Sequence, residues 1–171
     1  WVLSHMGDGS IAYNMPGALL LEGDIHREAL EHAFRQLVWR HESLRTTFIV
    51  VDEEPRQKIH VNPDSQLCFV DLTEDLRPEE RARELALEDA RKPFDLASGP
   101  LIRLSLLKLA ENRHVLLFNM HHIISDDWSM AVLVREFVHL YESVNKPEGS
   151  SLPPLSIQYR DYAIWQNCLL N

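Results

Sequence analysis

Residues His114–Met130, H-V-L-L-F-N-M-H-H-I-I-S-D-D-W-S-M, change from one hydrophobic pattern to another within a short stretch. The first part, up to Ile124, is an apolar run with the length and composition of a β-strand. After Asp126 and Asp127, apolar residues recur at helical spacing up to Val144. The stretch therefore predicts a strand that turns directly into a helix, with two adjacent histidines near the turn. Titratable residues at the end of a rigid strand are typical of a functional site.

The rest of the chain predicts an α/β fold, because helical and strand patterns are interspersed along it. Leu101–Leu109 and His114–Ile124 are two apolar runs separated by A-E-N-R, which predicts an antiparallel hairpin. Proline and glycine residues in 145–156 predict a loop or linker before the last helix. The remaining predicted elements are strands at Leu19–Leu21, Arg45–Val51, Gln57–Val61 and Cys68–Leu72, and helices at 25–41 (with Asp24 as N-cap), at Leu76–Lys92, from Asp127 or Trp128 to Val144, and at Tyr159–Leu170.

The composition is that of an ordinary globular chain with one hydrophobic core. Its 171 residues carry a formal net charge of −9, which argues against a nucleic-acid groove. No apolar run is long enough to span a membrane. Cys68 and Cys168 lack metal-ligand spacing, so we expect reduced thiols in a cytoplasmic protein. The sequence opens at Trp1 without an initiator methionine or signal peptide, and we expect it to be a piece of a longer chain.

His121 and His122 are the candidate reactive residues, and strand geometry separates them. Alternate side chains of a strand face opposite sides, so His122 should share a face with Phe118 and His121 with Asn119. Adjacent histidines on opposite faces are poor joint metal ligands, and no zinc site is expected. Two buried, hydrogen-bonded structural histidines are an alternative. A histidine held beside a rigid turn suits general acid–base chemistry near neutral pH, but these residues leave the reaction class open.

Asp126 follows His122 by four residues and stands where the predicted helix begins. A carboxylate at this position can accept hydrogen bonds from the free N–H groups of the first helical turn. It could instead pair with a nearby arginine. Either role would fix the loop and hold the histidines in place.

Several segments resemble the core motifs of condensation domains from nonribosomal peptide synthetases. Met120–Ser129, M-H-H-I-I-S-D-D-W-S, resembles the H-H-x-x-x-D-G motif of that family. The resembling segments stand in the family's order and cover essentially the whole chain. The others are Arg40–Phe48 (R-H-E-S-L-R-T-T-F, the second core motif), Tyr159–Gln166 (Y-R-D-Y-A-I-W-Q, the fourth), Trp1 with Tyr13–Pro16, and Pro93–Leu96 followed by Gly99–Leu101.

This resemblance implies a fold and an activity. The fold would be an α+β two-layer sandwich, one of the two lobes of a chloramphenicol acetyltransferase-like domain. Residues 1–171 would form the N-terminal lobe, with the C-terminal lobe absent, an apolar docking surface exposed and little activity in isolation. The family joins a donor thioester to an acceptor amine, both delivered on 4′-phosphopantetheine arms of peptidyl carrier proteins. An adenylation domain would be a neighbour, and the lobe itself would bind no cofactor, nucleic acid or membrane.

The resemblance also implies roles for individual residues. His122 matches the second histidine of the motif, on which the chemistry of the family depends. His121 matches the first histidine and is expected to support the site. Asp126 matches the motif aspartate, which in the family pairs with an arginine of the second motif. Arg45 is the matching position, so an Asp126–Arg45 ion pair is expected.

Asp127 departs from the motif, because the family has a glycine there. Glycine permits a positive φ without steric cost, whereas Asp adopts that region only at a penalty and adds a carboxylate. Asp127 and the adjacent Trp128 are assigned to the support of the site. The departure leaves an alternative open, a non-catalytic carrier-docking or structural lobe with a decayed site. A related epimerization or acyltransferase domain is a further alternative.

Overall fold

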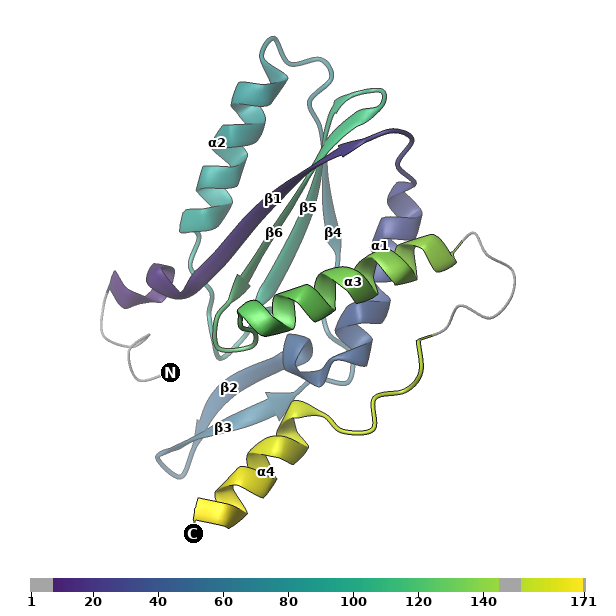
Figure 1. Cartoon of the computed structure of the whole chain (residues 1–171). Coiled ribbons are helices and arrows are strands. Elements are labelled where there is room, and N and C mark those ends of the chain that lie inside the picture. The colour runs from purple at the N-terminus through teal and green to yellow at the C-terminus, as the bar shows by residue number, and fades with distance from the viewer. Residues whose placement is uncertain (1–7, 145–151, 171) are drawn as a thin grey trace.

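The computed structural model describes residues 8–144 and 152–170, and a four-stranded sheet forms its centre (Figure 1). The strand order is β1-β6-β5-β4; β6 is antiparallel to both β1 and β5, whereas β4 is parallel to β5. The strands are β1 (Asn14–Glu22), β2 (Thr46–Val51), β3 (Glu54–Ile59), β4 (Leu67–Asp71), β5 (Ile102–Ala110) and β6 (Arg113–His121). The helices are η2 (Asp8–Tyr13), α1 (Arg27–Arg40), η3 (Glu42–Arg45), α2 (Pro78–Arg91), α3 (Asp127–Ser143) and α4 (Tyr159–Leu170).

Helices cover both faces of the central sheet. Figure 1 shows α1 and α3 together on one face and α2 on the other. The alternation within β6 explains this arrangement, because Leu116 and Phe118 pack toward α1 and α3 while Leu117 packs toward α2. The predicted α/β fold is confirmed. The expected two-layer sandwich has one layer of helices and one sheet. Because the central strands are apolar on both faces, α2 covers the second face and adds a third layer.

A separate two-stranded antiparallel sheet, β2 and β3, follows η3 in the region where strands at Arg45–Val51 and Gln57–Val61 were predicted. The predicted hairpin is formed by β5 and β6, which pair antiparallel. The turn residues between β2 and β3, Asp52 and Glu53, have φ values of 52° and 64°. A two-residue turn with positive φ at both positions matches the right-handed twist of the strands that it joins. Phe48 N donates a hydrogen bond to Leu96 O at 2.8 Å, which ties the β2–β3 hairpin to the loop after α2.

Two predicted elements differ in where they begin. β1 begins at Asn14, five positions before the predicted Leu19, because its whole length pairs with β6. This pairing partner is distant in sequence, so local propensity did not indicate it. α1 begins at Arg27, and the prediction of Asp24 as its N-cap is wrong. His26 takes the N-cap position without a side-chain hydrogen bond.

The strand that carries the histidines is shorter than predicted. β6 ends at His121, so His122 lies in the turn that follows and not in the strand. The predicted linker is described only in part: 152–156 contain neither helix nor strand, and 145–151 lie outside the described residues. Trp1, which belongs to the first motif-like segment, also lies outside them.

The carboxyl end of α2 is attached to the sheet by side chains from three strands. Asn119 is fully buried, and its Nδ2 donates to Asp89 O at 2.9 Å. Asn14 Nδ2 donates to Ala90 O at 2.8 Å, and Arg103 Nε donates to the Asp89 carboxylate at 2.7 Å. The last carbonyl groups of a helix have no partners within the helix, so these contacts stabilise its end. They also fix the strand ends beside the histidine turn.

Exposed apolar side chains gather on α4 and just before it. No residue of α4 is buried. Both cysteines are unpaired and exposed, and no helix in the described ranges is long and apolar enough to span a bilayer. The large exposed apolar residues of α4 and of the chain just before it are Leu155, Ile157, Tyr159, Tyr162, Ile164, Trp165, Leu169 and Leu170.

Gly17 lies under the ring of Phe118, its register partner in β6. A Cβ atom at Gly17 would lie 2.0 Å from Phe118 Cζ, far inside van der Waals contact. We expect Gly17→Ala to destabilise the fold by about 1–3 kcal/mol, the usual effect of overpacking. Urea denaturation of Gly17→Ala, Phe118→Leu and the double variant measures the effect. The double variant should recover part of the loss, and strictly additive losses would contradict this contact.

Candidate active site

A groove of about 1110 Å³ opens where the loop after β6 meets η3, the β2–β3 hairpin and the segment that leads into α4. Apolar side chains such as Phe48 and Ile123 alternate with polar ones along its wall. His122 reaches the groove from the turn after β6. The other titratable residues that line it are His41, Glu42, Asp126, Tyr159, Arg160 and Tyr162.

His121 and His122 take different positions at the end of β6. His121 is 3% exposed, whereas His122 is exposed and lines the groove. The backbone is held at both residues, since His121 N donates to Leu101 O at 3.0 Å and His122 N donates to Tyr13 O at 2.8 Å. The two side chains are therefore separated, as strand alternation predicted. Within 8–144 and 152–170, no group of three or more His, Cys, Asp or Glu residues could hold a metal ion.

The His121 side chain closes the turn. Its Nδ1 accepts a hydrogen bond from Ile123 N at 3.1 Å. A ring nitrogen can accept only while it carries no proton, so Nε2 carries the proton in this arrangement. The ring lies beside those of Tyr13 and Phe94, with centroid separations of 5.9 Å and 6.2 Å. Burial lowers the pKa of His121, and the charge of neighbouring His122 adds to this shift, so the neutral form is favoured.

We expect His121→Asn to retain the turn and His121→Gln to lose it. The Asn Oδ1 atom takes nearly the place of Nδ1 and can accept from Ile123 N, whereas Gln places its amide near the position of Nε2. An unsatisfied buried donor costs about 1–3 kcal/mol, so the Gln variant should be less stable by about this amount. Thermal denaturation and hydrogen exchange of the Ile123 amide measure the difference. Equal protection in both variants would contradict this role.

His121 also makes stability depend on pH. Because its folded-state pKa is lowered, the unfolded chain binds a proton first as the pH falls below the ordinary value of 6.5. The stability that this residue contributes is therefore complete above that value and is lost below it. His121→Asn should show a flatter decline of melting temperature between about pH 7.5 and pH 5.5.

Asp126 is the N-cap residue of α3. Its Oδ1 accepts hydrogen bonds from Ser129 N at 2.8 Å and from Ser129 Oγ at 2.5 Å. These two hydrogen bonds lower the pKa of Asp126, with a smaller contribution from the charge of His122. Of the two roles left open by the sequence, Asp126 has the capping role. It fixes the loop between His122 and the helix.

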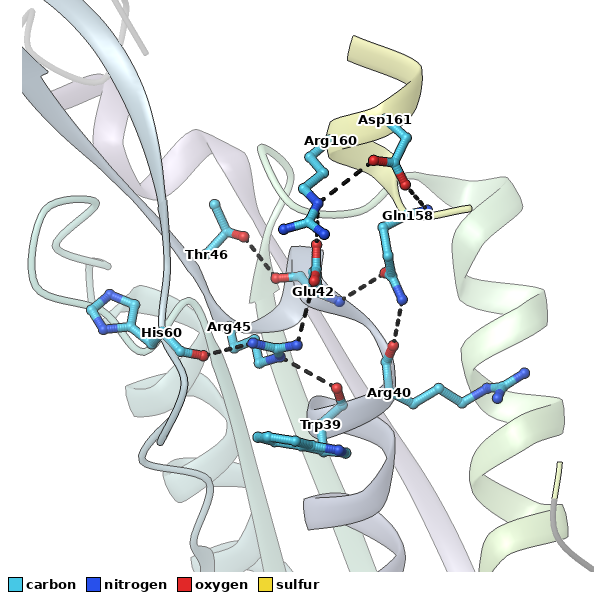
Figure 2. Close-up of polar contacts among 9 residues, drawn as sticks. All are labelled: Trp39, Arg40, Glu42, Arg45, Thr46, His60, Gln158, Arg160 and Asp161. Carbon is cyan, nitrogen blue, oxygen red and sulfur yellow. Dashed lines mark hydrogen bonds and ion pairs between the residues drawn. The ribbon is translucent and has the colours of Figure 1, made fainter. Parts of the chain in front are cut away.

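The predicted ion pair between Asp126 and Arg45 is wrong, and no such pair exists within the described part of the chain. Figure 2 shows the Arg45 guanidinium directed toward other groups. Nη1 donates to His60 O at 2.8 Å, Nε donates to Trp39 O at 3.3 Å, and Nη2 lies 3.7 Å from Glu42 Oε1. Arg45 is satisfied by these partners, while the carboxylate of Asp126 is engaged by its helix cap. Arg45 therefore supports η3 and the adjacent hairpin.

Asp127 and Trp128 form the first turn of α3. Among the described non-glycine residues, only Asp52 and Glu53 have a positive φ, so the backbone penalty expected at Asp127 is not found. The Asp127 side chain is exposed and does not line the groove. Trp128 is 84% exposed and does line it. Of these two side chains, that of Trp128 is therefore available to a molecule in the groove.

A buried carboxylate of α3, Glu136, joins this helix to the end of α1. Glu136 is 8% exposed, and its Oε2 lies 2.9 Å from Arg40 Nε and 2.7 Å from His41 Nε2. Burial alone would raise the pKa of Glu136, but hydrogen bonds from Arg40 and His41 outweigh it and lower the pKa. Glu136 is therefore ionised at neutral pH. It holds His41 at the groove.

Gln158 attaches the segment before α4 to the same region, as Figure 2 shows. Its Oε1 accepts from Glu42 N at 3.1 Å, and its Nε2 donates to Arg40 O at 3.0 Å. Glu42 Oε2 also lies 3.2 Å from Arg160 Nε. Because α4 buries no residue, these polar contacts hold its first turn against η3. They form one wall of the groove.

Comparison with known proteins identifies the family. The family model described as Condensation domain matches residues 1–171. The chain belongs to the condensation-domain family. Within this condensation-domain chain, the three main motif-like segments all contribute side chains to the groove, although they are far apart in sequence. These segments are Arg40–Phe48, Met120–Ser129 and Tyr159–Gln166.

The curated relatives are synthetases of peptide natural products. The chain is 45% identical over 166 residues to tyrocidine synthase 3 of Brevibacillus parabrevis. It is 42% identical over 167 residues to gramicidin S synthase 2 of Brevibacillus brevis. The alignments cover 97% and 98% of this chain but only 2% and 4% of those relatives. The chain therefore corresponds to a small part of each.

Solved structures show the same fold. The starter condensation domain of the rhizomide synthetase RzmA matches with a TM-score of 0.88 at 24% identity, over 98% of this chain and 40% of that chain. The X-domain from teicoplanin biosynthesis matches with a TM-score of 0.79 at 35% identity, over 92% of this chain and 34% of that chain. The condensation-domain chain thus has the chloramphenicol acetyltransferase-like fold that its motifs implied.

Sequence reasoning did not identify Glu136 or Gln158 as residues of this site. Glu136 stands three positions after Leu133 and four before Leu140, at the margin of the apolar stripe of α3. A charged residue beside an apolar helical stripe is a signal that could have identified Glu136, because a buried charge requires a partner. Gln158 offers no such signal, because its side-chain partners are backbone groups that approach it only in the folded chain.

Proposed function

We propose that this chain is the N-terminal lobe of a nonribosomal peptide synthetase condensation domain, and that the complete domain joins a donor acyl thioester to an acceptor amine. The observation that carries the proposal is the exposed His122 in a groove to which all three main motif-like segments contribute. A solvent-accessible histidine on a rigid turn is suited to contact a nucleophile and to move its proton.

The proposed reaction is the attack of the acceptor nitrogen on the thioester carbonyl carbon. The carbon–sulfur bond breaks, the donor thiol leaves, and the nitrogen loses a proton. A thioester is already activated, and an α-amino group has an ordinary pKa of about 8, so part of the acceptor is neutral near pH 7. We assign His122 to align the amine through a hydrogen bond and to accept a proton as the amide forms.

The neighbouring residues are assigned to positioning. His121 holds the turn through its bond to Ile123 N, and Asp126 holds the start of α3 through its bonds to Ser129. Together they restrict the residue between them, His122, to one place in the groove. Trp128 offers an exposed aromatic surface beside it. Such preorganisation matters because a small displacement of a reacting group is costly in rate.

Both substrates would arrive on 4′-phosphopantetheine arms of peptidyl carrier proteins, so this lobe would need no cofactor of its own. The larger assembly would include an adenylation domain and would work in the cytoplasm. The chain spans 40% of the rhizomide starter domain and 34% of the teicoplanin X-domain. The remaining part of such a domain would face the groove and exclude water. The lobe alone should therefore show no meaningful turnover.

Reconstitution with loaded carriers tests this function. The complete domain is mixed with one carrier that bears a donor acyl thioester and a second that bears an aminoacyl thioester. Intact-protein mass spectrometry should show the mass of the acyl group moving to the acceptor carrier. No transfer with any of several donor–acceptor pairs, despite binding of both carriers, would contradict the proposed reaction.

A non-catalytic interaction lobe is the second candidate. Two observations favour it: the motif glycine is replaced by Asp127, and the chain is 34% identical over 99% of its length to the X-domain in a complex of the X-domain and OxyB from teicoplanin biosynthesis. In this alternative the groove would serve to dock a partner protein and no amide would form.

The variant Asp127→Gly separates the two candidates. Asp127 needs no positive φ and its side chain does not line the groove, so we expect kcat/KM of the complete domain to change by less than about threefold, under 1 kcal/mol. The conservative change Asp127→Asn serves as the control for charge. A large gain in turnover with glycine, and none with asparagine, would show that the site had decayed through this residue.

A further inference from the structure

His41 is a second histidine of the groove, and a carboxylate holds its ring. It follows the last residue of α1, lines the groove, and places Nε2 2.7 Å from Glu136 Oε2. Arg40 binds the same carboxylate through Nε at 2.9 Å and Nη2 at 3.4 Å. The side chains of His41 and Glu136 are 15% and 11% exposed. Charge-assisted hydrogen bonds with so little access to water are strong and well oriented.

The contact with Glu136 determines the tautomer of His41. An ionised carboxylate can only accept, so Nε2 must carry the hydrogen of the 2.7 Å contact. In the neutral ring, the lone pair then lies on Nδ1. No described residue donates a hydrogen bond to that atom or accepts one from it. His41 therefore has a free proton acceptor, and Glu136 stabilises the imidazolium that results when Nδ1 takes a proton.

Carboxylates and arginines surround His41 in this part of the groove. The Arg40 guanidinium is paired with Glu136, and Arg160 lies 3.2 Å from the Glu42 carboxylate. Arg45 Nη2 lies 3.7 Å from the same Glu42 carboxylate, so three arginines share two carboxylates in this region. The charged and titratable groups that the surrounding elements bring to this region are Arg40 (α1), Glu42 and Arg45 (η3), Glu136 (α3), His122 and Asp126 (the loop after β6), and Tyr159, Arg160, Asp161 and Tyr162 (α4).

We propose that His41 and Glu136 form a second proton-accepting pair, which takes a proton from the ammonium form of the acceptor before the amide forms. One N–H bond of the ammonium breaks and a bond between the proton and His41 Nδ1 forms. The amine keeps the electron pair with which it attacks the thioester, and the imidazolium later returns its proton to water. This inference rests on the proposed function. It gives His41 a task separate from that of His122, which contacts the amine during the attack.

The test uses the complete domain with the substitution His41→Gln. The Gln amide nitrogen takes nearly the position of Nε2 and can still donate to Glu136, so the contact is retained while the proton acceptor is lost. Single-turnover amide formation is followed from about pH 6 to pH 9, with an aminoacyl-pantetheine acceptor and a carrier-bound donor. The neutral fraction of an amine with a pKa of about 8 falls about tenfold per pH unit below that value. We expect a loss of roughly tenfold near pH 6.5 that disappears near pH 9.

Glu136→Gln is the second variant, because it keeps the shape of the carboxylate but not the charge that stabilises the imidazolium. It should show the same loss at low pH. Two results would overturn the proposal: a pH profile of His41→Gln equal to that of the wild type, or a loss by the same factor at every pH with a lower melting temperature. Failure of the proposed function itself would look different, since the wild-type domain would then form no amide at any pH.

Discussion

Replacing His122 by alanine is expected to slow amide formation by the complete domain by about 10²–10⁴-fold, the usual contribution of a positioned acid–base group. The expectation follows from its place in the groove. His122 is exposed, while its backbone N–H is bound to Tyr13 O at 2.8 Å and the next amide is bound by His121. The side chain is therefore presented from a fixed backbone. Its removal should take away the contact with the amine and leave the fold intact.

The measurement is a single-turnover rate with both carriers loaded, accompanied by a melting curve. The matched control is His32→Ala, because His32 is exposed on α1 and does not line the groove. The control should keep the wild-type rate. Wild-type turnover by His122→Ala would remove this residue from the reaction. Unlike the loss expected for His41→Gln, the loss at His122 should persist at high pH, because alignment of the neutral amine is also lost.

Replacing Glu136 by alanine is expected to destabilise the fold by about 3 kcal/mol, which is large for one residue of a small domain. The substitution leaves the Arg40 guanidinium and the His41 ring without the carboxylate that both contact, in a region with little access to water. It also releases α3 from the end of α1. Removing one partner of a buried charged pair costs more than the pair contributes, because the remaining charge stays desolvated.

Chemical denaturation at several pH values measures this effect. Since the folded-state pKa of Glu136 is lowered, its contribution is complete above the ordinary value of 4.5 and is lost as the pH falls through the folded-state pKa. The difference between wild type and Glu136→Ala should therefore shrink in acid. Arg135→Ala, an exposed neighbour on the same helix, should change stability by no more than about 0.5 kcal/mol. A difference that is independent of pH would contradict the ionic contact.

The histidine turn illustrates what local pattern can predict. Strand alternation predicted that His121 and His122 are separated, and they are, although β6 ends at His121 and His122 lies in the turn. The position of Asp126 ahead of an amphipathic run allowed a helix cap. Both features depend on residues close in sequence, whose relative geometry is set by the regular strand and helix periods. The main helices and the hairpin were predictable for the same reason. The motif order then indicated the family, which the family comparison confirms.

The partner of Asp126 illustrates what local pattern cannot predict. The resemblance to the family's motifs implied an ion pair between Asp126 and Arg45. In the folded chain, Arg45 instead binds carbonyl groups of Trp39 and His60. The partners of Arg45 are the groups that lie within about 3 Å of its guanidinium. The packing of α1, η3 and the β2–β3 hairpin determines which groups these are. The start of β1 at Asn14 was missed for a similar reason, because its pairing strand lies about a hundred residues away.

The sequence by itself determined the strand-to-helix turn, the separation of the two histidines and the α/β class, because each depends on residue type and short-range periodicity. The order of its motifs indicated the family through their resemblance to known members. Only the tertiary structure decided that Arg45 binds Trp39 O and His60 O instead of Asp126, that Glu136 holds His41 at the groove, and that Gln158 attaches α4 to η3. A hydrogen bond requires contact between particular atoms, and residues from α1, α3 and α4 reach that contact only after the sheet has brought distant segments together.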